Sequence, residues 1–437
     1  MGSLLDKFDE WAEVEDEDFW KFIWKSYGPL IQISCMFPSY RRSMLPITLL
    51  TFAVHLLLLV PHFLLLVITI YQTIVDWDLE LCSLAIHFSL MIFYAIFTLF
   101  YVQYIRYAYS SQAKAMSTDI GNYISGRIYE DKWCVRAKEE NWQETLRLLI
   151  GPAFLMLGSG AVLILPYTLK TIKGLDNPYG AGMVNANLPI PAWYPFPTHE
   201  GAVHWIAVLY QLVAALSVGV IMMQVLLLFL SNAQRLRFEL SVVGYSMTSI
   251  LKRSMKLHLR ANPGLNRDEV DMWDPKFQSV VESCLRDSLL HHQTILELLS
   301  LFTTQTDTLV LLGYSVGTAS IGMSLFNILR ALNTQSYESI MLFTIMIMGE
   351  TLVMYILSYI GESITSQTSD LRNQLYYSPW NNFDLRNRKI FLNFHTAITE
   401  PIVITAGGLI PISLDTFSSI MNTAYSCFNL LNTQPEI

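Results

Sequence analysis

Seven long stretches of the 437-residue chain contain neither lysine nor arginine, and this pattern constrains the fold more than any other feature. Each stretch is long enough to cross a bilayer as a helix, which takes about 20 apolar residues. Only 15% of the residues are charged, against about 25% in soluble domains, so a soluble chain of this size lacks the charge to cover its core. The sequence therefore predicts an all-α membrane protein with seven transmembrane helices, over Pro46–Ile70, Leu81–Ile105, Leu148–Leu169, Gly201–Leu230, Leu289–Leu329, Ile340–Ile360 and Ala397–Leu431.

The basic residues between these stretches lie almost entirely on one side. Of the 28 lysines and arginines, 25 lie in the segments 1–45, 106–147, 231–288 and 362–396. The opposite side holds only Lys170, Lys173 and Arg330. Because basic loops stay on the cytoplasmic side, we expect a cytoplasmic N-terminus and an extracellular C-terminus.

The segment 231–288 carries apolar residues at helical spacing, which predicts that spans four and five continue as helices beyond the membrane. Such helices must pack on each other or on a neighbouring subunit. We expect a cytoplasmic helical anchor for assembly, with a plain membrane-proximal hairpin as the alternative. The loop 170–200 is rich in glycine and proline and carries Trp193, Tyr194 and Phe196, so it forms either a lid over the spans or an interfacial aromatic belt.

Motifs for catalysis or metal binding are absent from the sequence. It has no P-loop, no nucleophile elbow, no HExxH and no paired-cysteine motif, and His291-His292 has no companion ligands at fixed spacing. We expect no enzyme, no cofactor and no metal site. Acidic residues inside the predicted spans are costly in lipid, so each must face protein, water or a helix junction: Glu297, Asp307, Glu350, Glu400 and Asp415.

The last stretch carries a polar face. At about 100° per residue, one arc of about 100° holds Ser419, Asn422, Thr423, Ser426, Leu430 and Thr433. Such a stripe faces either a water-filled pore or a partner helix, and periodicity alone does not decide between them. A ring of Leu430 side chains from several subunits would close a pore by dewetting. Gly407, Gly408 and Pro411 predict a break in this helix.

The C-terminal strings resemble the signature of insect odorant receptors: Ser378-Pro379-Trp380, Leu385-Arg386-Asn387-Arg388-Lys389, Pro401–Gly408, Ser413–Phe417 and Tyr425–Phe428. The resemblance implies an odorant-gated, non-selective cation channel, tetrameric, with a shared co-receptor subunit and a pore lined by the last helix. It aligns Leu430 with the gate and Gln434 with the outer pore position. The co-receptor is longer after span four, so this chain resembles a ligand-tuned subunit.

The resemblance also implies a pocket in the outer half of the membrane, among spans two, three, four and six. A small neutral volatile suits the side chains there, because aromatic and methionine walls adapt to its shape and a few hydroxyls orient it. The implied ligand-binding residues are Phe88, Met91, Ile92, Ala95, Ser159, Leu163, Tyr167, His204, Val208, Leu212, Tyr337, Met341, Thr344 and Ile345.

The resulting organisation has six parts. The expected partners are a co-receptor subunit, an odorant and membrane lipid. The parts are a cytoplasmic N-terminal segment (1–45), a ligand-binding bundle of spans one to four (46–230), an anchor (231–288), spans five and six (289–361), a second anchor segment (362–396) and the pore-lining span seven (397–437). The expected location is the plasma membrane of olfactory neuron dendrites. The alternatives are a gustatory receptor channel, with the same architecture, and a G-protein-coupled receptor, whose N-terminus would be extracellular.

Overall fold

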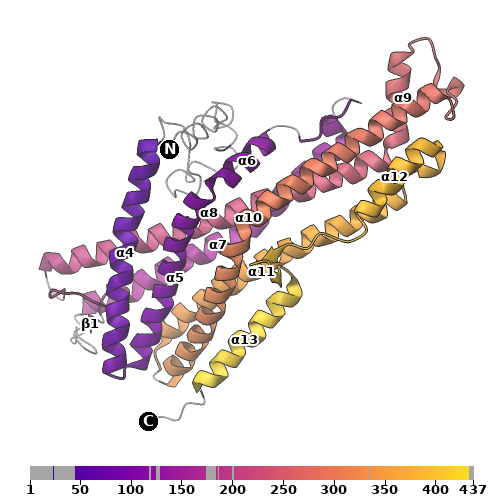
Figure 1. The fold of residues 1–437 in the computed structure, drawn as a ribbon. Helices are drawn as coiled ribbons and strands as arrows, with labels where there is room; N and C mark the ends of the chain where they lie inside the picture. Colours follow the sequence, from indigo (N-terminus) through magenta and orange to yellow (C-terminus); the bar gives the residue numbers. More distant parts are fainter. Residues whose placement is uncertain are drawn as a thin grey trace, which may run out of the picture.

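The computed structural model describes residues 23, 45–117, 120–124, 128–173, 184–185, 187–198, 201–333 and 335–432, and it is built almost entirely of helices (Figure 1). Five of these helices are long and apolar enough to cross a membrane, within the described ranges. They are α4 (Leu45–Val75), α5 (Leu79–Tyr104), α8 (Gly201–Thr248), α10 (Pro275–Asn333) and α11 (Tyr337–Tyr376). Two more long helices join them, α7 (Lys132–Lys173) and α13 (Leu414–Asn432).

The remaining elements are short. They are the helices α6 (Arg106–Ser117), α9 (Ile250–Ala261) and α12 (Leu385–Ala397), the 3-10 turns η1 (Ile128–Glu130), η3 (Arg267–Glu269) and η4 (Trp380–Asn382), and four two-residue strands. Strand β1 (Val184–Asn185) pairs antiparallel with β2 (Ala192–Trp193), and β3 (Thr405–Ala406) pairs antiparallel with β4 (Ile410–Pro411).

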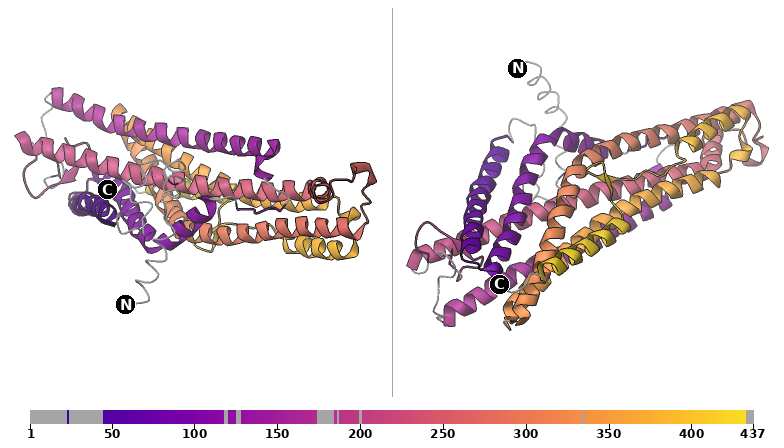
Figure 2. Two further views of the ribbon diagram at one scale, coloured as in Figure 1. Left: turned by 90° about the horizontal axis from the view of Figure 1, so that it is seen from above. Right: turned by 60° about the horizontal axis from the view of Figure 1, so that its bottom comes forward.

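Helices α8 and α10 run on well past the stretches predicted to span the membrane. The segment after Leu230 continues α8 to Thr248, and α10 begins at Pro275, before the predicted fifth span. The end of α8 and the start of α10 lie with α9 and α12 at one end of the molecule, whereas α4 and α5 lie at the other (Figures 1 and 2). Their shared core is apolar and fully buried, with Leu236, Leu240, Phe277 and Leu285 at 0% exposure.

Capping side chains fix where two of the helices start. Asp78 accepts a hydrogen bond from the main-chain N–H of Leu81 at 3.1 Å and begins α5. Asp384 accepts one from the N–H of Asn387 at 2.8 Å and begins α12. Each satisfies a donor that the first helical turn leaves unpaired.

The predicted stretch Ala397–Leu431 is not one helix. Its break lies where the glycines predicted it, because Gly407 and Gly408 have φ of +64° and +65° in the β3–β4 turn. The N–H of Gly408 donates to Asp307 Oδ1 at 2.7 Å, and the N–H of Gly407 donates to the Asp307 carbonyl at 3.1 Å. Asp307 of α10 thus anchors the hairpin, and helix α13 begins only at Leu414.

Candidate functional site

A buried apolar cluster lies where α4, α5 and α8 meet. It contains Phe88, Ile92 and Ala95 of α5 together with Val208 of α8, exposed by 8, 4, 0 and 5% respectively. Leu212 packs against it from the next turn of α8. The structure therefore brings together five of the seven α5 and α8 residues that the family resemblance implied. His204 is also buried near the start of α8, and Met91 is half-buried on α5.

The segment 187–198 covers this cluster, and we call the assembly the loop-covered cluster. Leu188, Ile190, Ala192 and Tyr194 are buried against the three helices. Gln211 of α8 fixes the segment, because its Oε1 accepts from the Ile190 N–H at 3.0 Å and its Nε2 donates to the Ile190 carbonyl at 2.8 Å. The described part of the loop is therefore packed into the bundle.

Two further contacts attach the same segment to its neighbours. The N–H of Trp193 donates to Thr69 Oγ1 of α4 at 2.8 Å. A ring nitrogen of His204 lies 2.8 Å from the Thr198 carbonyl, so this predicted ligand residue is engaged with the loop. The cover is thus held by α4 on one side and by α8 on the other.

The predicted residues of α11 are not part of the loop-covered cluster. Tyr337 and Met341 are 78 and 42% exposed, Thr344 is exposed and Ile345 is half-buried. Met346 is the α11 side chain that packs against the loop-covered cluster. The backbone of Ser159, Leu163 and Tyr167 belongs to α7, but their side chains lie outside the described residues.

Sequence reasoning missed the loop residues and Gln211. The glycines and prolines predicted a loop at 170–200, yet turn-forming residues do not reveal which side chains turn inward. One signal was available, because Leu188, Ile190 and Ala192 alternate with Pro189 and Pro191. A glutamine within an apolar span was a second, since it needs a partner there.

Helix α13 turns its polar face away from its own subunit. Ser419, Asn422, Thr423 and Ser426 are exposed, and Leu430 is 68% exposed. The opposite face, with Phe417, Ile420, Met421, Ala424 and Phe428, is buried or half-buried. That face packs on α10 and α11, so α13 lies on the outside of the bundle (Figure 1). Thr433 and Gln434, predicted for the pore, lie outside the described residues.

Two glycines allow α13 and its hairpin to approach the bundle. A Cβ at Gly322 of α10 would lie 3.3 Å from Cys427 Cβ and 3.4 Å from the Ala424 carbonyl of α13. At Gly361 of α11, a Cβ would overlap the carbonyl oxygen of Ile412 just before α13. The contact at Gly361 requires a residue without a side chain, whereas a Cβ at Gly322 would be tight against α13.

A second buried site lies between α8, α10 and residues 120–124 and 128–130, far along α8 from the loop-covered cluster. We call it the ionic network, and it comprises Tyr123, Tyr129, Glu239, Arg253, Asp287 and His291. Glu239 Oε2 lies 3.1 Å from His291 Nε2 and accepts from the Tyr129 hydroxyl at 2.8 Å. Arg235 pairs with the other carboxylate oxygen at 2.8 Å.

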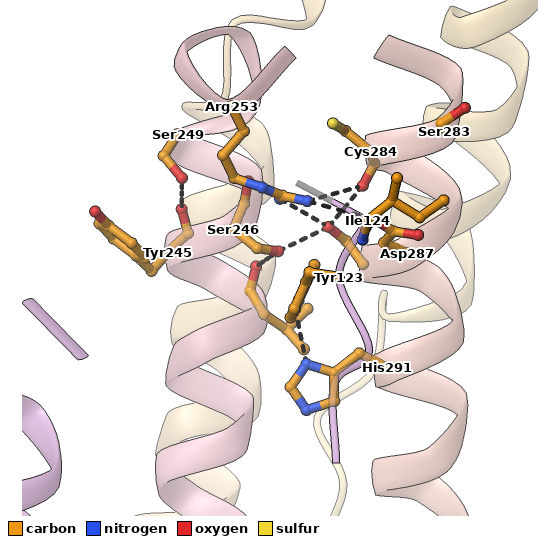
Figure 3. Close-up of polar contacts among 12 residues, drawn as sticks. Tyr123, Ile124, Tyr245, Ser246, Ser249, Arg253, Ser283, Cys284, Asp287 and His291 are labelled. Carbon is orange, nitrogen blue, oxygen red and sulfur yellow. Dashed lines mark hydrogen bonds and ion pairs between the residues drawn. The ribbon is translucent and has the colours of Figure 1, made fainter. Parts of the chain in front are cut away.

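The same network continues around Arg253 (Figure 3). Its guanidinium donates to the Ser246 carbonyl at 2.9 Å, lies 4.7 Å from the centre of the Tyr123 ring and is 4.0 Å from Asp287. Asp287 in turn accepts from the N–H of Ile124 at 2.9 Å. The Tyr123 hydroxyl is 2.7 Å from His291 Nδ1. These contacts fix residues 120–124 and 128–130 onto the α8–α10 pair.

Burial and pairing act in opposite directions on Glu239. Burial alone would raise its pKa, but the hydrogen bond with His291, the charge of Arg235 and the Tyr129 hydroxyl outweigh it, so the pKa lies below the ordinary value. Burial raises the pKa of Asp287, against the Ile124 N–H and Arg253. No three His, Cys, Asp or Glu side chains among the described residues are grouped to hold a metal ion.

The architecture defines a class, a multi-span helical membrane protein. The fold matches the insect olfactory receptor OR5 of Machilis hrabei, solved in complex with eugenol, with a TM-score of 0.74 and 11% identity, over 93% of this chain and 97% of that one. This likeness confirms the predicted all-α fold with seven transmembrane helices.

The chain belongs to the insect odorant receptor family, because the 7tm odorant receptor family model matches residues 126–425. Odorant receptor 22b of Drosophila melanogaster is 22% identical over 190 residues, 44% of each chain. Odorant receptor 85a of the same fly is 25% identical over 169 residues, 38% of this chain and 40% of that one. These alignments span less than half of either relative. The family consists of receptors rather than enzymes.

Proposed function

We propose that this protein is a subunit of an odorant-gated, non-selective cation channel, which binds a small neutral volatile and opens a pore shared with co-receptor subunits. The exposed polar face of α13 carries the proposal. A helix in lipid gains nothing from exposed hydroxyl and amide groups, whereas a helix around a water-filled axis does. Leu430 on that face supplies the hydrophobic constriction of a gate.

The ligand site of this proposal is the loop-covered cluster. Its walls are Phe88, Ile92, Ala95 and Val208, and the segment 187–198 covers them. Apolar walls with a few placed polar groups are typical of pockets for small organic ligands. Within the described part of the chain, the predicted α5 and α8 residues bear no formal charge, which favours a neutral ligand.

Helix α10 connects the ligand site to the pore helix. On one side the Tyr94 hydroxyl of α5 donates to the Leu309 carbonyl at 3.2 Å, and the Tyr101 hydroxyl donates to the Thr304 carbonyl at 2.9 Å. On another side Gly322 contacts α13. A ligand that changes the packing of α5 thereby shifts α10, and α10 carries the shift to α13.

The end of the molecule formed by α9, α12 and the tails of α8, α10 and α11 is the proposed intersubunit anchor. It is charged on its surface, with Arg286 and Arg386 both pairing with Glu282 at 2.8 and 2.9 Å. By the positive-inside rule, its basic residues support a cytoplasmic position on the same side as the N-terminus. The proposed location is the plasma membrane of olfactory neuron dendrites.

Co-expression tests this function. Cells that express the chain together with an insect co-receptor should give cation currents in response to members of a volatile panel, and cells with the chain alone should give little current. Full ligand-gated current from the chain alone would contradict the shared pore. An N-terminal epitope accessible on intact cells would instead favour a G-protein-coupled receptor, and expression in mouthpart neurons would favour a gustatory role.

A further inference from the structure

Polar side chains from three helices meet in a buried seam beside the loop-covered cluster. Helices α5 and α10 each present polar residues at helical spacing, and α11 adds one acid. We call this set the polar seam, and its members are Ser83, His87, Ser320, Ser324, Asn327 and Glu350. Five of the six are at most 8% exposed, and the Glu350 side chain is 10% exposed.

His87 is at the centre of the polar seam. Its Nε2 lies 3.4 Å from Glu350 Oε1, and its Nδ1 lies 3.3 Å from Ser324 Oγ. The main chain of Ser320, one turn away on α10, is also within hydrogen-bonding reach of the ring. Nearer the start of α5, the Ser83 hydroxyl donates to Asn327 Oδ1.

Several polar atoms of the seam have no hydrogen-bond partner among the described residues. They are Glu350 Oε2, the Ser320 hydroxyl and the Asn327 amide nitrogen, whereas Glu350 Oε1 faces His87 Nε2. An unsatisfied buried polar group costs about 1–3 kcal/mol, and more when it is charged. A seam with both spare acceptors and spare donors, buried within the membrane, has the chemistry of a recognition site.

The polar seam borders the proposed ligand site directly. The rings of His87 and Phe88 are in edge-to-face contact, with centroids 5.6 Å apart, and Phe88 is a wall of the loop-covered cluster. A small molecule whose apolar part lies against Phe88 therefore reaches the seam with its polar end.

We propose that the polar seam selects ligands with a hydroxyl group, alcohols and phenols. A hydroxyl is both donor and acceptor, so it donates to Glu350 and accepts from Ser320 or Asn327. An ether, ester or aldehyde has no hydroxyl hydrogen to donate to an oxygen of Glu350. This inference rests on the proposed function, since it names the chemical class of the ligand.

The position of the seam on α10 gives such binding a route to the pore helix. Ser320 and Ser324 lie in the seam, while Gly322 between them contacts α13 on another face of the same turn. A hydroxyl bound at Ser320 therefore acts on the α10 segment that supports α13.

Isomeric ligands test the inference without any change to the protein. The probes are hexanol against methyl pentyl ether, and benzyl alcohol against anisole, each pair having one formula. Binding is measured by the thermal stabilisation of detergent-solubilised receptor, and gating by current in cells that also express the co-receptor. We expect each alcohol to bind about 10- to 100-fold more tightly than its ether.

Variants then assign the preference to the seam. Glu350→Gln keeps the shape of the side chain and should remove most of the alcohol preference, and Ser320→Ala should reduce it. Thr98→Val is the matched control, because the buried Thr98 hydroxyl donates only to the Tyr94 carbonyl of its own helix. Its alcohol preference should be unchanged.

The outcomes separate the two proposals. Equal binding of alcohols and ethers to the unaltered receptor would overturn the seam, whether or not current flows. An alcohol preference retained in Glu350→Gln and Ser320→Ala would do the same. Alcohol-selective binding without current would support the seam and contradict the channel.

Discussion

The loop-covered cluster and the ionic network lie far apart along α8 and are held by different forces. In the cluster, Ile92 and Val208 contact their neighbours by apolar packing, which has no preferred direction. In the network, Glu239 and Arg253 are fixed by charged hydrogen bonds whose geometry is specific. Packing of the first kind readjusts to differently shaped ligands, whereas contacts of the second kind hold one arrangement. The difference fits a variable binding end and a constant assembly end.

Removing the carboxylate of Glu239 should have the largest effect on stability. Glu239→Ala leaves Arg235 and His291 without their carboxylate partner. Breaking a buried ion pair costs about 3–5 kcal/mol. The thermal inactivation midpoint of solubilised protein should fall sharply. Glu362→Ala is the control, because Glu362 is exposed on α11. Equal midpoints for the two variants would show that the network does not fix this end.

The polar anchor of the loop should matter less. Gln211→Leu leaves the N–H and carbonyl of Ile190 unpaired in the bundle, at a cost of about 1–3 kcal/mol. We expect faster proteolytic cleavage within 187–198, with the midpoint only moderately lowered. Gln143→Leu, at an exposed position, should leave both unchanged. Unaltered cleavage in Gln211→Leu would mean that apolar packing alone holds the loop.

A one-carbon change at each end should separate binding from assembly. Ile92→Val and Ile364→Val remove the same methyl from buried sites, each at about 0.5–1.5 kcal/mol. Volatiles in a panel can be ranked by the concentration that gives a half-maximal response. Only Ile92→Val should change that ranking. Reordering by Ile364→Val, far from the cluster, would contradict the proposed division between the two ends.

The pH dependence of the network should be the smallest effect. The pKa of Glu239 in the folded protein lies below its ordinary value of 4.5. Its contribution to stability is therefore complete above pH 4.5 and is lost as the pH falls through the lower, folded value. The inactivation midpoint measured against pH should drop at the acidic end, and Glu239→Gln should flatten that part of the curve. An unchanged curve in the variant would exclude Glu239 as its source.

The sequence predicted the number and class of the helices because both depend on bulk hydropathy. Stretches without lysine and arginine mark where a helix can cross lipid but not where it ends, since α7 and α10 begin well before the stretches that they contain. The break at Gly407 and Gly408 was also predictable, because glycine pairs and proline interrupt helices locally. The residue that anchors this break was not predictable, because Asp307 lies in a helix about a hundred residues earlier.

The sites were less predictable because they depend on contacts between distant segments. His291 was interpreted as an isolated histidine, and nothing near it in the chain indicates Glu239 or Tyr129. Glu350 was likewise a lone acid within a predicted span, and nothing near it in the chain indicates His87, which lies 3.4 Å away in another helix. The α5 and α8 residues of the loop-covered cluster could be inferred from family resemblance by region, but the sequence left open whether the loop 170–200 is a lid or an aromatic belt.

The central claim is that the polar face of α13 lines the conduction path, and cysteine accessibility tests it most directly. In a Cys427→Ser background, which removes an exposed native thiol, Ser426→Cys places a thiol on the polar face and Ile420→Cys places one on the packed face. A positively charged methanethiosulfonate reagent applied to cells that also express the co-receptor should block odorant-evoked current in Ser426→Cys and spare Ile420→Cys. Block of Ile420→Cys with no effect on Ser426→Cys would contradict the account.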